Sequence, residues 1–211
     1  MIKILIADDH PIVRQGLRQI IQDEKDMKVV CEAANSEEVL VKLKEQDIDV
    51  LLLDIAMPGK SGLELLIDLK IQYPNLPILV LSALPEEAYA KRVIKMGAMG
   101  YIHKESTPEL LVPAIRKAMS GQTYISSKLV DILVSDLSGK DKGSIHEQLS
   151  EREFEVLRLI GSGKSVGEIA EVLNLAVTTI STYRARILEK LKLKNNAEII
   201  QYCITEHLLT H

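Results

Sequence analysis

Short apolar runs alternate with stretches of helical spacing through the first 120 residues of the chain. The apolar runs that predict strands are Ile2–Ala7, Lys28–Cys31, Val50–Leu53, Ile78–Leu81 and Gly100–Ile102. The helices that follow them are expected from Pro11, from Ser36, over Gly62–Tyr73, over Pro85–Met96 and from Thr107. Strands that are continuously apolar are typical of parallel sheets covered on both faces. Because crossovers between parallel strands are right-handed, the pattern predicts an α/β fold with a doubly wound five-stranded sheet.

The alternation ends at Gly121, and the pattern beyond it is entirely helical. Ser127–Leu137 has room for one short helix, and the charged, glycine-flanked stretch Ser138–Ser144 is typical of a flexible linker. Capping-box signals at Ser150 and Ser165 each start a helix. Two further helices are expected over 177–191 and 196–208. The predicted segments are an α/β domain at 1–122, a linker at 123–147 and an all-α four-helix domain at 148–211.

Composition places the chain among globular proteins and excludes several classes. Its 211 residues carry 26 Lys and Arg against 30 Asp and Glu, a net charge of −4, and 46% of them are hydrophobic. The first apolar run stops at Asp8, far short of the roughly 18–20 residues that a membrane span needs, and no export signal is present. An aromatic content of 3% argues against a stacking platform for single-stranded nucleic acid. Cys31 and Cys203 are too far apart for a CxxC motif, and we expect reduced thiols in a cytoplasmic protein without membrane contact.

Chemically useful side chains follow four of the five predicted strands. They are Asp8 and Asp9, Asp54, Ser82 and Lys104. In the common 2-1-3-4-5 strand order these four strands lie side by side, and ligands bind beyond their carboxyl ends. Three carboxylates brought together repel one another unless a hard cation compensates, and carboxylates are ligands that Mg²⁺ accepts.

Asp54 is then placed to attack a phosphoryl group, while Ser82 offers a hydroxyl and Lys104 a positive charge. Each of these residues alone has an ordinary role as a helix cap, a turn residue or a surface charge. Their coincidence at one edge of one sheet favours the functional interpretation.

Four separated motifs in these residues resemble the receiver domain of two-component response regulators, which has a flavodoxin-like fold. The motifs are Asp8-Asp9-His10, the run Leu51 to Gly59 with Gly62 behind it, Ser82-Ala83, and Tyr101 to Lys104. The resemblance implies that Asp54 accepts phosphate from a sensor histidine kinase and that the protein is no enzyme beyond its own phosphotransfer and dephosphorylation. It further implies Mg²⁺ ligation by Asp9 and Asp54, with Asp8 assisting mostly through water and the Ala56 carbonyl completing the site. Tyr101 matches the aromatic residue that moves inward when Ser82 closes on the phosphate. Ala56 brings no polar side chain two places after the acceptor, which leaves the phosphate lifetime open.

The helices that start at Ser165 and near Val177 are separated by the short turn Asn174–Ala176, a spacing typical of a helix-turn-helix. At 100° per residue, the second helix gathers Ile180, Ile187 and Leu191 into one apolar stripe, with Leu188 at its margin and Tyr183 beside it. The opposite face carries Thr178, Ser181, Thr182, Ala185, Arg186 and Glu189. Such a small, hydroxylated and partly basic face suits the major groove of DNA. The basic run Arg184, Arg186, Lys190, Lys192 and Lys194 faces only Glu189 and suits backbone phosphates.

The same segment resembles the LuxR-type helix-turn-helix of the NarL/FixJ group. The matching residues are Leu149–Glu153, Glu155–Leu157, Gly163–Ser165, Glu168–Ala170, Thr179-Ile180 and Lys190-Leu191. The residues predicted to contact DNA are Thr178, Thr179, Ser181, Thr182, Arg184, Ala185, Arg186, Lys190 and Lys194. The resemblance implies double-stranded DNA, a second copy of the chain on two half-sites, and RNA polymerase as partners. Ser181, Tyr183 and Ala176 depart from residues common in the group, and Ala176 forgoes a helix cap worth about 0.5–2 kcal/mol.

Other functions stay open at this stage. The main alternative is a phosphorylation-controlled protein-interaction module that does not bind DNA. An α/β phosphatase is disfavoured because the position two places after the nucleophile holds Ala56 and not a second acid. A flavin binder is disfavoured because Asp8 and Asp9 would repel the flavin phosphate after the first strand.

Overall fold

The computed structural model describes residues 1–57, 62–130 and 145–209. The chain divides into two compact units, Met1–Val130 and Asp131–His211, and each is described by itself. The predicted linker at Ser138–Ser144 lies outside the described residues, as does the predicted short helix beyond Val130; its first residues, Ser127–Val130, are helical. Within the described ranges, no helix is both long enough and apolar enough to cross a bilayer.

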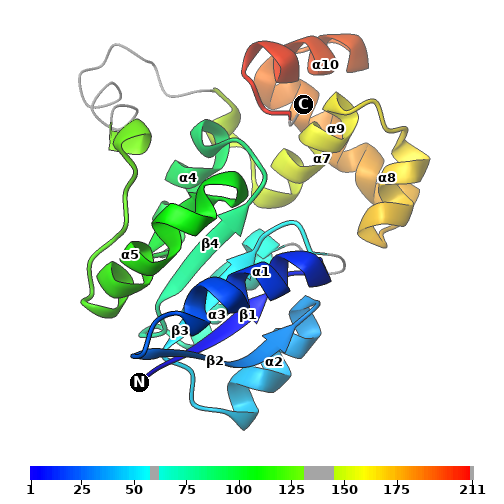
Figure 1. Ribbon diagram of the computed structural model, residues 1–211. Helices are drawn as coiled ribbons and strands as arrows, with labels where there is room; N and C mark the ends of the chain where they lie inside the picture. Colours follow the sequence, from blue (N-terminus) through cyan, green and yellow to red (C-terminus); the bar gives the residue numbers. More distant parts are fainter. Residues whose placement is uncertain (58–61, 131–144, 210–211) are drawn as a thin grey trace. The chain divides into compact units, whose positions relative to one another are not determined.

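The first unit is an α/β fold with a five-stranded parallel sheet in the order β2-β1-β3-β4-β5 (Figure 1). The predicted doubly wound topology is therefore confirmed. The strands are β1 Ile2–Ala7, β2 Met27–Ala33, β3 Val50–Asp54, β4 Ile78–Ser82 and β5 Gly100–His103. The helices are α1 Pro11–Gln22, α2 Ser36–Glu45, α3 Gly62–Gln72, α4 Glu86–Lys95 and α5 Thr107–Met119, with the short 3-10 turn η1 Lys104–Ser106 before α5.

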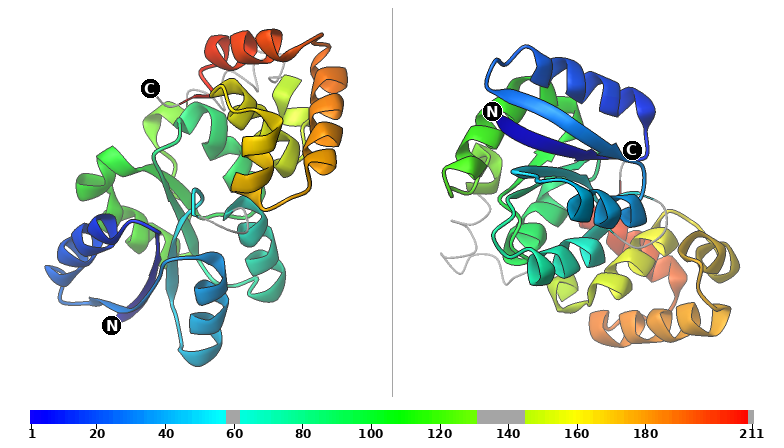
Figure 2. Two further views of the ribbon diagram at one scale, coloured as in Figure 1. Left: turned by 90° about the vertical axis from the view of Figure 1, so that its right-hand side faces the viewer. Right: turned by 90° about the horizontal axis from the view of Figure 1, so that it is seen from below.

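Helices cover both faces of the sheet (Figure 2). On one face, α1 and α5 pack against each other and bury Leu17, Ile21, Leu111 and Ile115 on the strands. On the other face lie α2, α3 and α4. The central strand β3 is buried at all five positions, so its apolar side chains fill both layers. This packing fixes the strands and thereby the loops at their carboxyl ends.

Helix α2 begins at Ser36, as predicted, and its cap is Asn35, whose side chain accepts a hydrogen bond from the Glu38 amide at 2.9 Å. Strand β2 starts one residue before the predicted range and ends two residues after it, at Ala33. It is an edge strand, and its polar residue Glu32 is half-buried and paired with arginines of α1.

The described part of the second unit is all helical. Its elements are the 3-10 turn η2 Ile145–Gln148 and the helices α7 Glu151–Gly161, α8 Val166–Leu173, α9 Val177–Leu191 and α10 Asn196–Thr205. Complete capping boxes start α7 at Ser150 and α8 at Ser165, as predicted. Asn174, which follows the last residue of α8, adopts the left-handed conformation, and α9 begins after Ala176 without a side-chain cap. Helix α10 ends three residues before the predicted Leu208.

Candidate functional site: an acidic pocket and a recognition helix

The acidic pocket lies where β1 and β3 end. These strands are neighbours in register, Ala7 opposite Leu53, so Asp8 and Asp54 emerge next to each other. Both carboxylates are buried. One ligand atom each from Asp8, Asp9, His10 and Asp54 lies within 4.8 Å of all the others. The structure therefore brings together the three carboxylates that the sequence predicted for one edge of the sheet.

Lys104, which follows β5, forms ion pairs with both buried carboxylates. Its ammonium nitrogen lies 2.6 Å from Asp54 Oδ2 and 2.7 Å from Asp8 Oδ2. The other oxygen of Asp54 accepts a hydrogen bond from the Ala56 amide at 2.9 Å. Since β4 separates β3 from β5 in the sheet, only a long side chain at this position can reach across. The arrangement places a positive charge beside the oxygens of the predicted nucleophile.

Burial and pairing act in opposite directions on each of these two groups, and the net shift raises the pKa of both Asp54 and Lys104. Burial raises the pKa of Asp54, and the opposing contacts with Lys104 and the Ala56 amide do not cancel that rise. For Lys104, burial acts to lower the pKa, but its contacts with Asp54 and Asp8 outweigh burial and raise the pKa. The ammonium group therefore stays protonated over the physiological pH range.

Ser82 and Tyr101 both hold the loop between β4 and α4. Ser82 is buried at the end of β4, and its Oγ accepts a hydrogen bond from the Leu84 amide at 3.2 Å. Tyr101 on β5 is also buried, and its hydroxyl donates to the Leu84 carbonyl oxygen at 2.5 Å. Ser82 and the predicted switch residue Tyr101 thus contact the same residue of one loop.

The outer face of α9 is the second candidate site. Ile180, Ile187 and Leu191 are buried, which confirms the predicted apolar stripe. The six residues predicted for the opposite face are all exposed: Thr178, Ser181, Thr182, Ala185, Arg186 and Glu189. The hydroxyls of Ser181 and Thr182 donate to helix carbonyls four residues earlier, at 2.9 and 3.0 Å, which fixes their direction and leaves each oxygen able to accept. Thr179 lies half-buried at the edge of this face.

The basic residues of this segment fall into two groups. Lys190 lies 2.6 Å from Glu153 Oε2 on α7, and Arg184 donates through Nε to Asn196 Oδ1. Within the described ranges, no hydrogen bond or ion pair engages the side chains of Arg186 or Lys194. The sequence grouped these four cations as DNA contacts, and the structure gives two of them partners within the chain.

Comparison with known families explains why both sites occur in one chain. Residues 4–116 match the response regulator receiver domain, and residues 147–203 match the bacterial regulatory proteins of the luxR family. The chain is a response regulator of the NarL/FixJ group.

Similar proteins cover almost all of this response regulator. It is 38% identical to the oxygen regulatory protein NreC of Staphylococcus carnosus over 214 residues, which span 98% of the chain and 99% of that protein. The structure of RcsB from Salmonella typhimurium matches with a TM-score of 0.76 and 31% identity over 97% of the chain and 98% of RcsB. RcsB of Salmonella enterica serovar Typhimurium, bound to the promoter P1flhDC in the presence of the phosphomimetic BeF3⁻, matches with a TM-score of 0.74 and 30% identity over the same shares.

The acidic pocket of this response regulator has the donor set of a divalent-cation site. Three carboxylates face one ammonium group, so the pocket keeps a negative excess. Asp8 Oδ2 and Asp9 Oδ1 are buried oxygens that accept no well-directed hydrogen bond, although Lys104 and His10 each lie 2.7 Å away as ion-pair partners. Carboxylate oxygens with unused lone pairs are what Mg²⁺ prefers, so these residues fit the ion. Ligation by the Ala56 carbonyl stays a prediction.

Sequence reasoning missed Arg14, which contacts the acidic loop from α1. Its guanidinium donates to the Asp8 carbonyl oxygen at 2.6 Å and to Glu32 Oε2 at 3.1 Å. Nothing in the local pattern marks this residue, because a basic residue on the first turns of a helix is ordinary. The signal that could have found Arg14 is the polar residue Glu32 on β2, because a half-buried carboxylate needs a partner.

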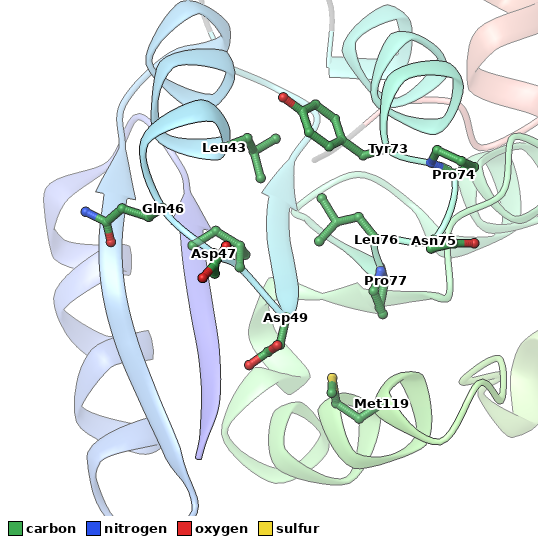
Figure 3. Close-up of a pocket in the computed structure, with 11 residues that line it drawn as sticks. Leu43, Gln46, Asp47, Asp49, Tyr73, Pro74, Asn75, Leu76, Pro77 and Met119 are labelled. Atoms are coloured by element: carbon green, nitrogen blue, oxygen red, sulfur yellow. The ribbon is translucent and has the colours of Figure 1, made fainter.

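A cavity of about 620 Å³ lies away from both sites, at the amino ends of β3 and β4 (Figure 3). Its wall includes Leu43, Asp49, Leu76 and Met119. Asp49 precedes β3 and Leu76 precedes β4, so the cavity lies at the edge of the sheet opposite Asp54, which ends β3. The cavity is therefore separate from the acidic pocket and holds none of the predicted site residues.

Proposed function

We propose that this response regulator accepts a phosphoryl group on Asp54 from a sensor histidine kinase, and that phosphorylation controls its binding, as a dimer, to promoter DNA. The observation that carries the proposal is the position of the Lys104 ammonium group, 2.6 Å from Asp54 Oδ2 and 2.7 Å from Asp8 Oδ2. The RcsB complex with promoter DNA and a phosphomimetic supports a connection between phosphorylation and DNA binding.

In the transfer, an Asp54 oxygen forms a bond to phosphorus while the bond from phosphorus to the donor nitrogen breaks, and the donor leaves with that electron pair. Lys104 already contacts Asp54, so its charge is in place for the oxygens of the arriving phosphoryl group. Ser82, at the end of the adjacent strand β4, supplies a hydroxyl for another of these oxygens. Mg²⁺ held by Asp8, Asp9 and Asp54 would neutralise the remaining negative charge.

The exposed face of α9 is the part that we propose to enter the major groove. Ser and Thr hydroxyls and Arg186 are exposed there, and such groups bind base edges and phosphates. Two copies on two half-sites would double the contacts. If the phosphorylated receiver favours the dimer, linkage makes phosphorylation and DNA binding strengthen each other by the same factor.

We further propose RNA polymerase as a partner and a cytoplasmic location beside the kinase domain. We also propose that the protein is not an enzyme for other substrates, because the phosphoryl group would remain on Asp54 until it is hydrolysed there.

The phosphorylation step is tested with acetyl phosphate and Mg²⁺, followed by intact-protein mass spectrometry. The wild-type chain should gain one phosphoryl group and Asp54→Asn should gain none. Asp47→Asn, which removes an exposed carboxylate from the far edge of the sheet, is the matched control and should behave as the wild type. Equal uptake by Asp54→Asn contradicts the assignment.

The DNA-binding step is tested by capture and sequencing of genomic duplexes with and without BeF3⁻ and Mg²⁺. The captured duplexes should share a repeated half-site and bind more tightly when the phosphomimetic is present. Arg186→Ala should weaken this binding at unchanged helicity, while Lys44→Ala, an exposed change on α2, should not. A chain that retains no duplex in either state would instead support the protein-interaction alternative.

A further inference from the structure

Arg14 joins three elements around the acidic loop. It lies on the second turn of α1, and its side chain is 16% exposed. Nη1 donates to the carbonyl oxygen of Asp8 at 2.6 Å, and Nε donates to Glu32 Oε2 on β2 at 3.1 Å. One guanidinium group therefore connects α1, the edge strand β2 and the loop that carries Asp8 and Asp9.

These contacts fix the backbone that leads from one acidic residue to the next. The Asp8 amide donates to the Ala33 carbonyl at 3.1 Å, and the Asp8 carbonyl accepts from Arg14. The amide of His10 donates to Asp8 Oδ1 at 2.8 Å. The Asp8 carbonyl belongs to the peptide group that carries the Asp9 nitrogen, so a bond to this oxygen sets where the Asp9 side chain begins.

Arg18 provides an internal comparison for Arg14. It lies one helical turn later, contacts the same carboxylate through Glu32 Oε1, and is 43% exposed. Within the described residues, its hydrogen bonds go to Glu32 and not to the acidic loop. The two arginines thus share the ion pair with β2, and only Arg14 contacts Asp8.

We propose that Arg14 is a positioning residue for the divalent cation: it holds the Asp8–Asp9 peptide so that both carboxylates present their oxygens to one ion. This inference rests on the metal site of the proposed function. The role is opposed by simple electrostatics, because a guanidinium group near the pocket repels a cation. The two effects differ in sign, so the loss of Arg14 weakens Mg²⁺ binding through lost positioning or strengthens it through lost repulsion.

The test measures Mg²⁺ affinity of the unphosphorylated full chain by calorimetric titration, for the wild type, Arg14→Gln, Arg14→Met and Arg18→Gln. Groups that orient metal ligands typically change metal affinity about 10–100-fold when mutated, and we expect about tenfold weaker binding for both Arg14 variants. Arg18→Gln should stay within about twofold of the wild type, because the contact with Asp8 remains. Urea denaturation identifies the folded variants, and either Arg14 variant that folds carries the test.

Phosphorylation gives a second readout that a merely structural role would not move. With acetyl phosphate as donor, the Mg²⁺ concentration for half-maximal uptake should rise in Arg14→Gln, while the maximal rate at saturating Mg²⁺ stays near the wild-type value. Arg14→Lys, which keeps the charge and a donor group but not the planar fork, should recover part of the affinity. Tighter or unchanged Mg²⁺ binding in the folded Arg14 variants, or an equal loss in Arg18→Gln, overturns the inference. Phosphate uptake by Asp54→Asn would instead overturn the proposed function and leave the Mg²⁺ result standing.

Discussion

The sequence assigns Lys190 to the DNA contacts, whereas the structure pairs it with Glu153. The variant Lys190→Met distinguishes these two roles. Its ammonium nitrogen lies 2.6 Å from Glu153 Oε2 and 3.3 Å from the Gln148 carbonyl oxygen. The Glu153 side chain is 3% exposed, whereas that of Lys190 is 37% exposed. If the ion pair is the main role of Lys190, its loss leaves a buried carboxylate without its cation.

The expected effect lies between two limits. Breaking a fully buried ion pair costs about 3–5 kcal/mol, and breaking an exposed pair costs about 0–1 kcal/mol. One partner here is buried and the other is screened by water, and Glu153 keeps the hydrogen bond from the Ser150 amide at 2.7 Å. We therefore expect Lys190→Met to lower the stability of the second unit by about 2 kcal/mol at pH 7.

The same pair predicts a pH dependence. Burial raises the pKa of Glu153, but the Lys190 contact and the Ser150 hydrogen bonds outweigh burial and hold the pKa below its usual 4.5. A carboxyl whose folded pKa is depressed stabilises the fold above its unfolded pKa and loses that contribution as the pH falls through the folded value. The stability difference between the wild type and Lys190→Met should thus be full at pH 7 and shrink below pH 4.5.

Hydrogen-exchange mass spectrometry of α7 and α9 in the full chain measures this local stability. Lys194→Met is the matched control, and it should leave exchange unchanged because no ion pair holds Lys194 within the described residues. DNA binding should show the opposite pattern. In a plot of log binding constant against log salt concentration, Lys194→Met should make the slope shallower by about 0.9 for each bound copy, and Lys190→Met should leave the slope unchanged. A flatter slope with normal exchange in Lys190→Met would refute the ion-pair interpretation.

Three further predictions follow from packing, from the burial of a thiol and from the hydrogen bonds of one hydroxyl. A Cβ at Gly62 would lie 2.3 Å from the backbone just after β3, so Gly62→Ala should destabilise the receiver by about 1–3 kcal/mol in thermal unfolding. A Cβ at Gly16 would lie in open space within α1, so Gly16→Ala should stabilise the receiver by about 0.5–1 kcal/mol. Burial raises the pKa of Cys203 to about 12, so iodoacetamide should label this thiol only after unfolding, and rapid labelling of the native chain would contradict this. The Ser126 hydroxyl donates a hydrogen bond to the Glu86 carboxylate and accepts one from the Leu129 amide. Ser126→Ala should therefore speed hydrogen exchange over 127–130 without changing exchange in α1.

Most of the fold could be predicted because hydrophobic spacing and burial agree along the chain. Strand β1 and helix α9 begin and end at the predicted residues, since Asp8 stops the first and Ala176 and Lys192 flank the second. Strand β2 was predicted too short because an edge strand tolerates polar residues that interrupt an apolar run. Its end at Ala33 depends on pairing with β1, which a local pattern does not contain.

The acidic pocket was predictable for a topological reason, and its hydrogen-bond partners were not. Strand ends in a parallel sheet meet at one edge, so Asp8, Asp54 and Lys104 converge whatever their separation in sequence. The contact of Arg14 with the Asp8 carbonyl depends on the reach and rotamer of one side chain from a helix packed on another strand. Residue type and spacing do not encode that reach.

Helix geometry nevertheless predicts which basic residues of α9 have partners within the chain and which do not. Measured from the buried stripe at 100° per residue, Arg184 lies about 40° away, Lys190 about 80° and Arg186 about 120°. The two residues nearer the stripe are the ones with partners on neighbouring elements, Asn196 and Glu153, whereas the farther one has no hydrogen bond or ion pair within the described residues. A cation that flanks a buried stripe can reach the helix packed against it, whereas a cation on the far side can reach only solvent or a ligand. Angular distance from the stripe, rather than the number of charges in the run, is therefore the better sequence criterion for which cations are available to DNA phosphates.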